Sequence, residues 1–449
     1  MRKDFAVIVQ LGLAFAFIFS AFNSQGLIEI SVLRGISKAA PESGITEKSG
    51  YYSLSIIYFV FTISNLFVPP IVQALGSKWS QVTGALCYLV FMLAFLRLNA
   101  LLLYAGSALL GFGAALLWTG NGMFLVQFSR NGKLARNCGV MWAMIQSSLI
   151  IGAIFLIFVL RTGDLNSVYQ LIYTAFAVIS SVGILVLACL PSYPPVYELE
   201  EVTSGSQENL IEAAENREDD VFIRRQTSSL LNDFREEKRS DYFFTADMLV
   251  LSITFMYTGI EMTFYTGVFT ACISATTALS GYSDLIIPYS ALAIGSGQII
   301  GGMLTGTITK THSISKSQFV IFGMIAHIVS FFLCFISIPF DSPLHKSNSM
   351  TYIEPSLAVI LLTGFLLGLA DAFWQTQVYA VIGLVYGDHS ASAFALFKFF
   401  QSFAACVSFY YGSLLFLHWQ LLILVVTCFC ASLAFVQIDL KTRSIVNNE

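Results

Sequence analysis

Charged residues are scarce in this chain of 449 residues: Asp, Glu, Lys and Arg together make up 11% of it, whereas hydrophobic residues make up 56%. A water-soluble domain carries about 25% charged residues. So few charges cannot cover a soluble surface of this size, and we therefore expect most of the chain to face the lipid bilayer. The formal net charge of -4 gives no basis for binding nucleic acid.

Motifs for catalysis and metal binding are also missing. The eight cysteines form no CxxC pair and have no metal-ligand spacing to the five histidines, so we interpret them as buried free thiols. The sequence shows no nucleotide-binding loop and no nucleophile–base set. We expect neither an enzyme nor a metal or other cofactor. The N-terminal segment "MRKDFAVIVQLGLAFAFIFSAF" has no A-x-A site, so we interpret it as a first span that is retained.

Long apolar segments run through the chain. A bilayer core of about 30 Å requires roughly 20 apolar residues per helix. A scan on that basis predicts an all-α multi-pass membrane protein with twelve spans in two sets of six, near 5–28, 52–75, 79–97, 100–128, 137–160, 168–190, 246–272, 285–308, 317–338, 356–386, 391–416 and 418–437. The boundary between the last two spans, near Leu417 and His418, is the least defined.

The basic residues predict the orientation. With the N-terminus in the cytoplasm, sixteen Lys and Arg lie in inner segments and six in outer ones. Because cytoplasmic loops carry an excess of Lys and Arg, both termini are expected in the cytoplasm.

The stretch 191–245 is charged and poor in aromatics, as expected of a flexible cytoplasmic linker between a bundle at 1–190 and a bundle at 246–437. Residues 438–449 would form a cytoplasmic tail. The linker contains "PPVY" (Pro194, Pro195, Val196, Tyr197), which fits a WW-domain ligand. It also contains Thr227 after two arginines, a pattern that basophilic kinases accept. Four-residue matches of this kind also arise by chance.

The two halves resemble each other. "GVMWAMIQS" (139–147) and "FALFKFFQS" (394–402) share a Gln-Ser ending, and Trp118 and Trp374 occur at the same depth in "ALLWTGN" and "DAFWQTQ". Matches in the same order along both halves predict a six-plus-six duplication, the architecture of the major facilitator superfamily.

Several long segments resemble one branch of that superfamily. "SIIYFVFTISNL", "GFGAALLWTGNG", "RNCGVMWAMIQSS", "YTGIEMTFYTGVFTACI" and "ALFKFFQS" are similar to the Unc-ninety-three-like proteins. The resemblance implies two pseudo-symmetric six-helix bundles. Members of this branch are described as transporters, as regulatory subunits of potassium channels and as trafficking chaperones of receptors. The turn "GSKWSQ" lacks the Asp-Arg pair of the usual facilitator gate motif, which argues against ordinary facilitator gating.

Three charged residues stand inside predicted spans: Glu261, Asp371 and Lys398. An ionisable group at such a depth is costly, so each should face a cavity or a partner. Because spans 10 and 11 are consecutive, we expect an Asp371–Lys398 ion pair, or Lys398 reaching towards the inner interface. Glu261 has no evident counter-charge.

A central cavity is expected where spans 1, 4, 7 and 10 meet, as the facilitator fold implies. Tyr257, Glu261 and Tyr265 lie at i, i+4 and i+8 and form one helical stripe. The other candidate lining residues are Asn23, Gln25, Trp118, Asn121, Asp371, Trp374 and Gln375. Such groups suit a polar or cationic solute, or proton coupling through Glu261. The alternative is that the amides and aromatics only join helices, and we assign the glycines 295, 297, 301, 302 and 306 to close helix packing.

Two functions remain open. One is a secondary transporter of a small polar or cationic solute, with proton coupling. The other is an accessory protein that regulates the activity or trafficking of another membrane protein, such as an ion channel or receptor. The fold favours the first, and the missing gate motif and the PPVY sequence favour the second.

Overall fold

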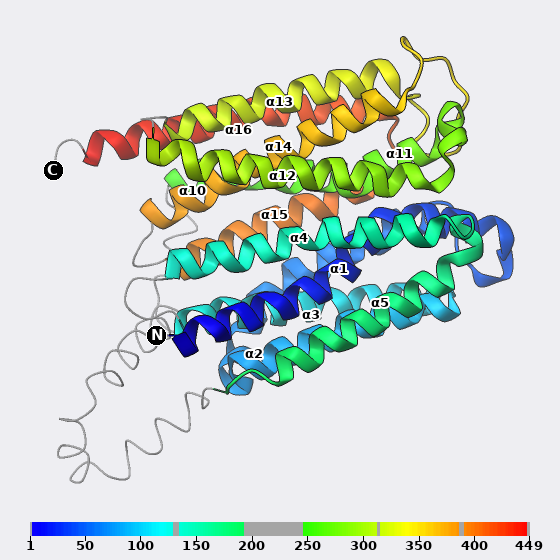
Figure 1. The fold of residues 1–449 in the computed structure, drawn as a ribbon. Helices are drawn as coiled ribbons and strands as arrows, with labels where there is room; N and C mark the ends of the chain where they lie inside the picture. The colour runs from blue at the N-terminus through cyan, green and yellow to red at the C-terminus, as the bar shows by residue number, and fades with distance from the viewer. Residues whose placement is uncertain (1, 129–133, 193–245, 312–314, 386–389, 447–449) are drawn as a thin grey trace, which may run out of the picture.

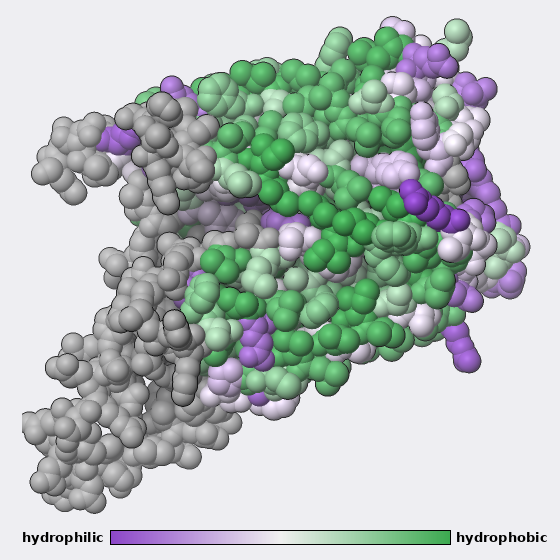
Figure 2. All heavy atoms as spheres, viewed as in Figure 1, coloured by the Kyte–Doolittle hydropathy of each residue, from purple (hydrophilic) through white to green (hydrophobic). Residues whose placement is uncertain are grey.

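The computed structural model describes residues 2–128, 134–192, 246–311, 315–385 and 390–446. Within these ranges the chain is helical and contains no strand beyond one isolated β-bridge between Thr276 and Ser347. Ten helices of the described residues are long and apolar enough to cross a membrane. Figure 2 shows the result as a broad apolar belt over the helices, with polar atoms gathered at one end of the molecule. The chain is an integral membrane protein.

The first half contains five helices that provide six spans. They are α1 (Arg2–Ala39), α2 (Ser49–Ala94), α3 (Ala100–Gln127), α4 (Leu134–Leu160) and α5 (Leu165–Ala188). The long helix α2 holds two spans, because the backbone leaves helical geometry at Gly76, where φ is 77° and ψ is 158°. A positive φ of this size favours glycine, which lacks a Cβ. The predicted break between spans 2 and 3 is therefore confirmed.

The second half has the same number of spans. They are formed by α10 (Ala246–Thr263) continuing through a π-helical turn (Phe264–Val268) into α11 (Phe269–Ala275), then α12 (Ile286–Thr311), α13 (Lys316–Ser337), α14 (Leu357–Val385), α15 (Ser390–Gly412) and α16 (Leu417–Val446). The uncertain boundary between the last two spans thus falls between Gly412 and Leu417. The predicted linker, including Pro194, Pro195, Tyr197 and Thr227, lies outside the described residues from 193 onward.

Two helices are longer than predicted. α1 runs to Ala39 rather than to residue 28, and so includes Glu29 and Arg34. α16 runs to Val446, so most of the predicted tail at 438–449 continues a helix. In both cases the helix passes charged residues at which a hydropathy scan ends a span.

Glycines set the closest helix contacts of the second bundle. A Cβ added at Gly297 of α12 would lie 2.1 Å from the Phe365 carbonyl oxygen of α14, and one at Gly301 would lie 2.7 Å from Cβ of Ala372. Gly302, on the other side of α12, has nothing within 4 Å. Close packing is thus confirmed for Gly297 and Gly301, whereas Gly302 faces open space.

The start of α1 and the end of α16 lie at one end of the molecule, which we call the terminal end (left in Figure 1); the opposite end is the distal end. Among the described residues, the hydrogen bonds between the two bundles lie in the distal half. They are Ser31–Ser274, Arg34–Pro343, Tyr51–Pro343, Ser55–Cys406 and Thr62–Ser402. We call this set the distal seal. The bundles are joined by polar contacts on the side away from the termini.

Candidate functional site

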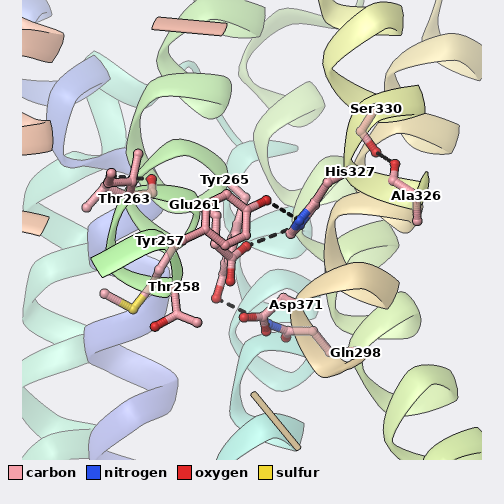
Figure 3. A network of polar contacts seen from close by, with 12 residues as sticks. Tyr257, Thr258, Glu261, Thr263, Tyr265, Gln298, Ala326, His327, Ser330 and Asp371 are labelled. Atoms are coloured by element: carbon pink, nitrogen blue, oxygen red, sulfur yellow. Dashed lines mark hydrogen bonds and ion pairs between the residues drawn. The ribbon is translucent and has the colours of Figure 1, made fainter. Parts of the chain in front are cut away.

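Glu261 lies near the end of α10 and is 1% exposed. The π-helical turn begins three residues later, at Phe264. Single π-helical turns interrupt helices mostly at functional sites. The predicted stripe of Tyr257, Glu261 and Tyr265 is buried throughout, and Figure 3 shows these three side chains facing α12, α13 and α14.

His327 of α13 is the partner that Glu261 lacked in the sequence. Its Nε2 lies 3.3 Å from Oε2 of Glu261, and its Nδ1 lies 2.5 Å from the hydroxyl oxygen of Tyr257 (Figure 3). Neither the histidine nor the tyrosine is exposed. If the Tyr257 hydroxyl donates to Nδ1, the imidazole carries its proton on Nε2, which faces the carboxyl group. Tyrosine, histidine and glutamate therefore lie in a row, with their polar atoms 2.5 Å and 3.3 Å apart.

A second carboxyl group completes the cluster. Asp371 of α14 is 2% exposed, and its Oδ2 accepts a hydrogen bond of 2.7 Å from Nε2 of Gln298. The same amide nitrogen lies 3.3 Å from the hydroxyl of Tyr265. The carboxyl groups of Asp371 and Glu261 lie within hydrogen-bonding reach of each other. Because two carboxylates are both acceptors, this contact is favourable only when one of them holds a proton.

The aromatic residues close the cluster on the side of α14. Trp374 is fully buried, and its ring centroid lies 4.8 Å from that of Tyr257. Its indole Nε1 and Oε1 of Gln375 have no hydrogen-bond partner among the described residues. The structure therefore brings together five of the candidate residues, Tyr257, Glu261, Tyr265, Asp371 and Trp374, with two that were not among the candidates, His327 and Gln298. We call these seven residues the Glu261 cluster.

The predicted ion pair between Asp371 and Lys398 is not among the ion pairs of the described residues. Nζ of Lys398 donates a 2.8 Å hydrogen bond to Oε1 of Gln401 and lies 4.7 Å from the ring centroid of Phe397. The reason is the order of the helices in space: α14 packs mainly against α12 and α13, whereas α15 packs against α2 and α10. Consecutive spans were taken as close neighbours, whereas α14 and α15 touch each other only slightly.

The residues predicted in the first bundle have partners of their own. Nδ2 of Asn23 donates to the Ser148 hydroxyl of α4 at 3.1 Å, and the Trp118 ring lies 5.2 Å from that of Phe19. Asn121 is buried, and its Oδ1 has no partner among the described residues. Gln25 contacts Glu29. None of these contacts connects them with the Glu261 cluster.

His327 and Glu29 were missed in the sequence for different reasons. His327 stands alone in "GMIAHIVSF", and only the general rule that an ionisable group in a span needs an explanation singles it out. Glu29 was assigned to a loop, because the first span was ended at residue 28.

The Glu261 cluster can hold and release protons within the membrane. It contains two carboxyl groups, an imidazole and two phenols on helices α10, α13 and α14 and on the π-helical turn. Within the described residues it contains no metal-binding group of three His, Cys, Asp or Glu side chains. In this conformation Glu261 does not contact solvent, so access to it requires a movement of the helices.

Comparison of the sequence with known proteins identifies relatives over its whole length. The chain is 33% identical to "UNC93-like protein MFSD11" of Xenopus laevis, with 98% of each chain covered. It is 24% identical to "Protein unc-93 homolog A" of Bos taurus, with 92% of this chain and 89% of that protein covered.

Solved structures share the arrangement of the helices. The nucleoside transporter NupG matches with a TM-score of 0.62 at 14% identity, over 96% of this chain and 98% of that chain. A peptide transporter POT in complex with sulfate matches with a TM-score of 0.65 at 12% identity, over 96% and 93%. Both support the facilitator fold predicted from the repeat. The family model described as "Ion channel regulatory protein UNC-93" matches residues 41–436, and the chain therefore belongs to the UNC-93 family.

Proposed function

We propose that the protein is a secondary transporter of a small polar or cationic solute, driven by protons that bind at the Glu261 cluster. The observation that carries this proposal is the pair of buried carboxyl groups, Glu261 and Asp371, beside the imidazole of His327. If Glu261 only joined two helices, one polar partner would be enough. In a cluster of several proton-binding groups at contact distance the titrations are coupled, so a proton is taken up by the group as a whole.

The fold supports this proposal. The structural neighbours NupG and POT are named as transporters of nucleosides and of peptides. In facilitators, substrates and coupling ions bind near the bilayer midplane, at the interface of the repeats. Glu261 belongs to the first span of the second repeat and lies about fifteen residues into α10, or roughly 22 Å along it at 1.5 Å per residue. This position near the middle of the span Ala246–Ala275 supports a proton-binding site at membrane depth.

The distal seal indicates which side of the membrane the protein is closed to in this conformation. We assign the termini to the cytoplasm from the excess of Lys and Arg in the segments at that end. The distal seal then closes the outer side of the protein. In this assignment the structure corresponds to a conformation that is closed to the outside and opens towards the cytoplasm. A transport cycle requires the distal seal to open and the cytoplasmic half to close.

The test is uptake by the purified chain in proteoliposomes. Pools of small polar and cationic metabolites are offered under an inward proton gradient, and the lumen is analysed by mass spectrometry. The proposal expects at least one solute to accumulate with wild-type protein and with Glu354→Gln, an exposed glutamate in the loop before α14, and not with Glu261→Gln. If no solute accumulates under any pH gradient, the proposal fails.

An accessory role is the second candidate, because the family that contains the chain is described as an ion channel regulatory protein. The turn "GSKWSQ" without the Asp-Arg pair also favours it. In this role the protein would bind another membrane protein, such as a channel or receptor, and the PPVY sequence would bind a WW-domain protein. Proximity labelling in cells tests this candidate. A stable membrane-protein partner that is lost on disruption of the apolar outer face would support it, and recovery of no such partner would exclude it.

A further inference from the structure

A second buried glutamate lies in the other bundle. Glu29 of α1 is 0% exposed, and its Oε2 accepts a 2.5 Å hydrogen bond from Nε2 of Gln25, one turn earlier on the helix. The hydroxyls of Ser53 on α2 and Tyr173 on α5 face this pair. Three polar atoms here, Oε1 of Glu29, Oε1 of Gln25 and the Tyr173 hydroxyl, have no hydrogen-bond partner among the described residues.

Among the residues that the structure describes, no basic side chain compensates the charge of Glu29. The nearest along α1 is Arg34, which is turned away by about 140° at 100° per residue. Its Nη2 donates a 2.7 Å hydrogen bond to the Pro343 carbonyl of the second bundle. The ion pairs of the described residues include none at Glu29. The titratable groups that face it are the phenols of Tyr58 and Tyr173, which are neutral acceptors and donors.

A carboxylate buried without a counter-charge is too costly to persist in a membrane span. The cost is removed in two ways: the carboxyl group takes up a proton, or its oxygen binds a small cation together with neighbouring oxygens. The oxygens of Gln25 and Tyr173 that lack a partner lie beside that of Glu29 and suit the binding of a small cation. Hard cations prefer carboxylate, amide and hydroxyl oxygens. Buried polar atoms without partners require such an explanation.

The geometry points to a cation-binding site inside the N-terminal bundle, formed by Glu29, Gln25, Ser53 and Tyr173 and filled by one small monovalent cation, a proton or Na⁺. It is separate from the Glu261 cluster and does not depend on the transport function proposed above. The distal seal lies immediately beyond it, since Ser31 and Arg34 of the same helix contact the second bundle. The site and the distal seal therefore share helix α1.

The site is tested by the thermal stability of the purified full chain in detergent, at constant ionic strength, with NaCl compared with choline chloride. A cation that binds only the folded protein raises its Tm. With Na⁺ well above its Kd, we expect a rise of at least roughly 2–4 °C. If the cation is Na⁺, we expect this rise in wild type and in Glu42→Gln, an exposed glutamate of the loop after α1, and its loss in Glu29→Gln. Glu29→Asp keeps the carboxyl group on a shorter side chain, so the rise in Tm should require a higher Na⁺ concentration. This variant is used in place of Glu29→Gln if Glu29→Gln does not fold.

Infrared difference spectra between acidic and alkaline pH distinguish the proton from Na⁺. If the ligand is the proton, Na⁺ has no effect on Tm, and a protonated carboxyl band of wild type disappears in Glu29→Gln and persists in Glu261→Gln. If Glu29→Gln and Glu42→Gln respond identically to Na⁺ and show the same carboxyl bands as wild type, the site does not exist. Because Glu261→Gln is measured in parallel, failure of this site is distinct from failure of the proposed transport.

Discussion

Nε2 of His327 and Oε2 of Glu261 lie 3.3 Å apart, on two helices, with no exposure of the imidazole. The opposite ring nitrogen contacts the Tyr257 hydroxyl at 2.5 Å. Both nitrogens of one histidine therefore face side chains of α10, and Nδ1 is the one that is hydrogen-bonded. These two contacts orient the imidazole ring and bring the carboxyl group of Glu261 on α10 next to His327 on α13.

Replacing His327 tests how far this arrangement stabilises the bundle. His327→Ala removes the partner of both Tyr257 and Glu261, and leaving buried polar groups unpaired costs about 1–3 kcal/mol each. We expect a clearly lower Tm of the purified protein in detergent. His345→Ala is the control, because His345 is exposed and contacts only Asp341 among the described ion pairs. Equal Tm values for the two variants would show that the His327 contacts contribute nothing.

The glycines of α12 provide a matched pair. Gly297→Ala places a Cβ 2.1 Å from the Phe365 carbonyl oxygen, so α12 and α14 must separate, and overpacking of this kind costs about 1–3 kcal/mol. Gly302→Ala meets nothing within 4 Å and should leave stability unchanged or raise it by up to about 1 kcal/mol, because Ala has the higher helix propensity. Thermal unfolding of both variants measures the difference. A Gly297→Ala variant as stable as Gly302→Ala would contradict the described contact between α12 and α14.

The contacts of Asp341 predict that the loop between α13 and α14 becomes less stable at acidic pH. Partial burial opposes its ionisation, but hydrogen bonds from Ser347 and Ser349 and the charge of His345 outweigh it, so the pKa of Asp341 lies below its ordinary value of 3.8. A depressed pKa stabilises the folded loop above the unfolded value, and this stabilisation is lost as the pH falls through the folded pKa. Below about pH 4 we therefore expect weaker protection of the Ser347 amide, which bonds to the Ala275 carbonyl.

Hydrogen exchange of that amide measures the effect. In Asp341→Asn the carboxyl group is absent, so protection should be lower at neutral pH and should no longer change between pH 6 and pH 3. Protection that falls with acid equally in wild type and in Asp341→Asn would assign the sensitivity to another group.

Opening of the distal seal can be tested by a cross-link. The hydroxyls of Ser31 on α1 and Ser274 on α11 lie 2.8 Å apart. Ser31→Cys combined with Ser274→Cys should form a disulfide under mild oxidation, stop solute uptake in proteoliposomes, and regain uptake on reduction. Each single substitution should remain active under the same oxidant. Full uptake by the cross-linked protein would mean that the distal seal does not have to open.

Much of the fold follows from the sequence because it depends on local patterns. Apolar runs predicted twelve spans, Gly76 marked the break within α2, and the Tyr257–Glu261–Tyr265 stripe followed from helical spacing. These features need no knowledge of which helix packs on which. The end of α1 was misplaced because Glu29 and Arg34 lower the hydropathy there, although both are buried within the fold.

The partners across helices could not be predicted in the same way. The contact of Glu261 with His327 depends on side chains that meet between α10 and α13, and that of Asp371 with Gln298 depends on α12 packing beside α14. Chain order suggested Lys398 for Asp371 instead. Spatial order differs from chain order here, because the neighbours of α15 are α2 and α10.

Proton movement during solute uptake tests the central claim most directly. Proteoliposomes that contain a pH-sensitive dye are supplied with the solute that wild type accumulates, and the rate of luminal acidification is recorded. Wild type and Glu354→Gln should acidify the lumen as solute enters, and Glu261→Gln should reduce that rate by about a hundredfold, the lower range of what a proton-transferring side chain contributes. Acidification by Glu261→Gln at the wild-type rate would contradict the account.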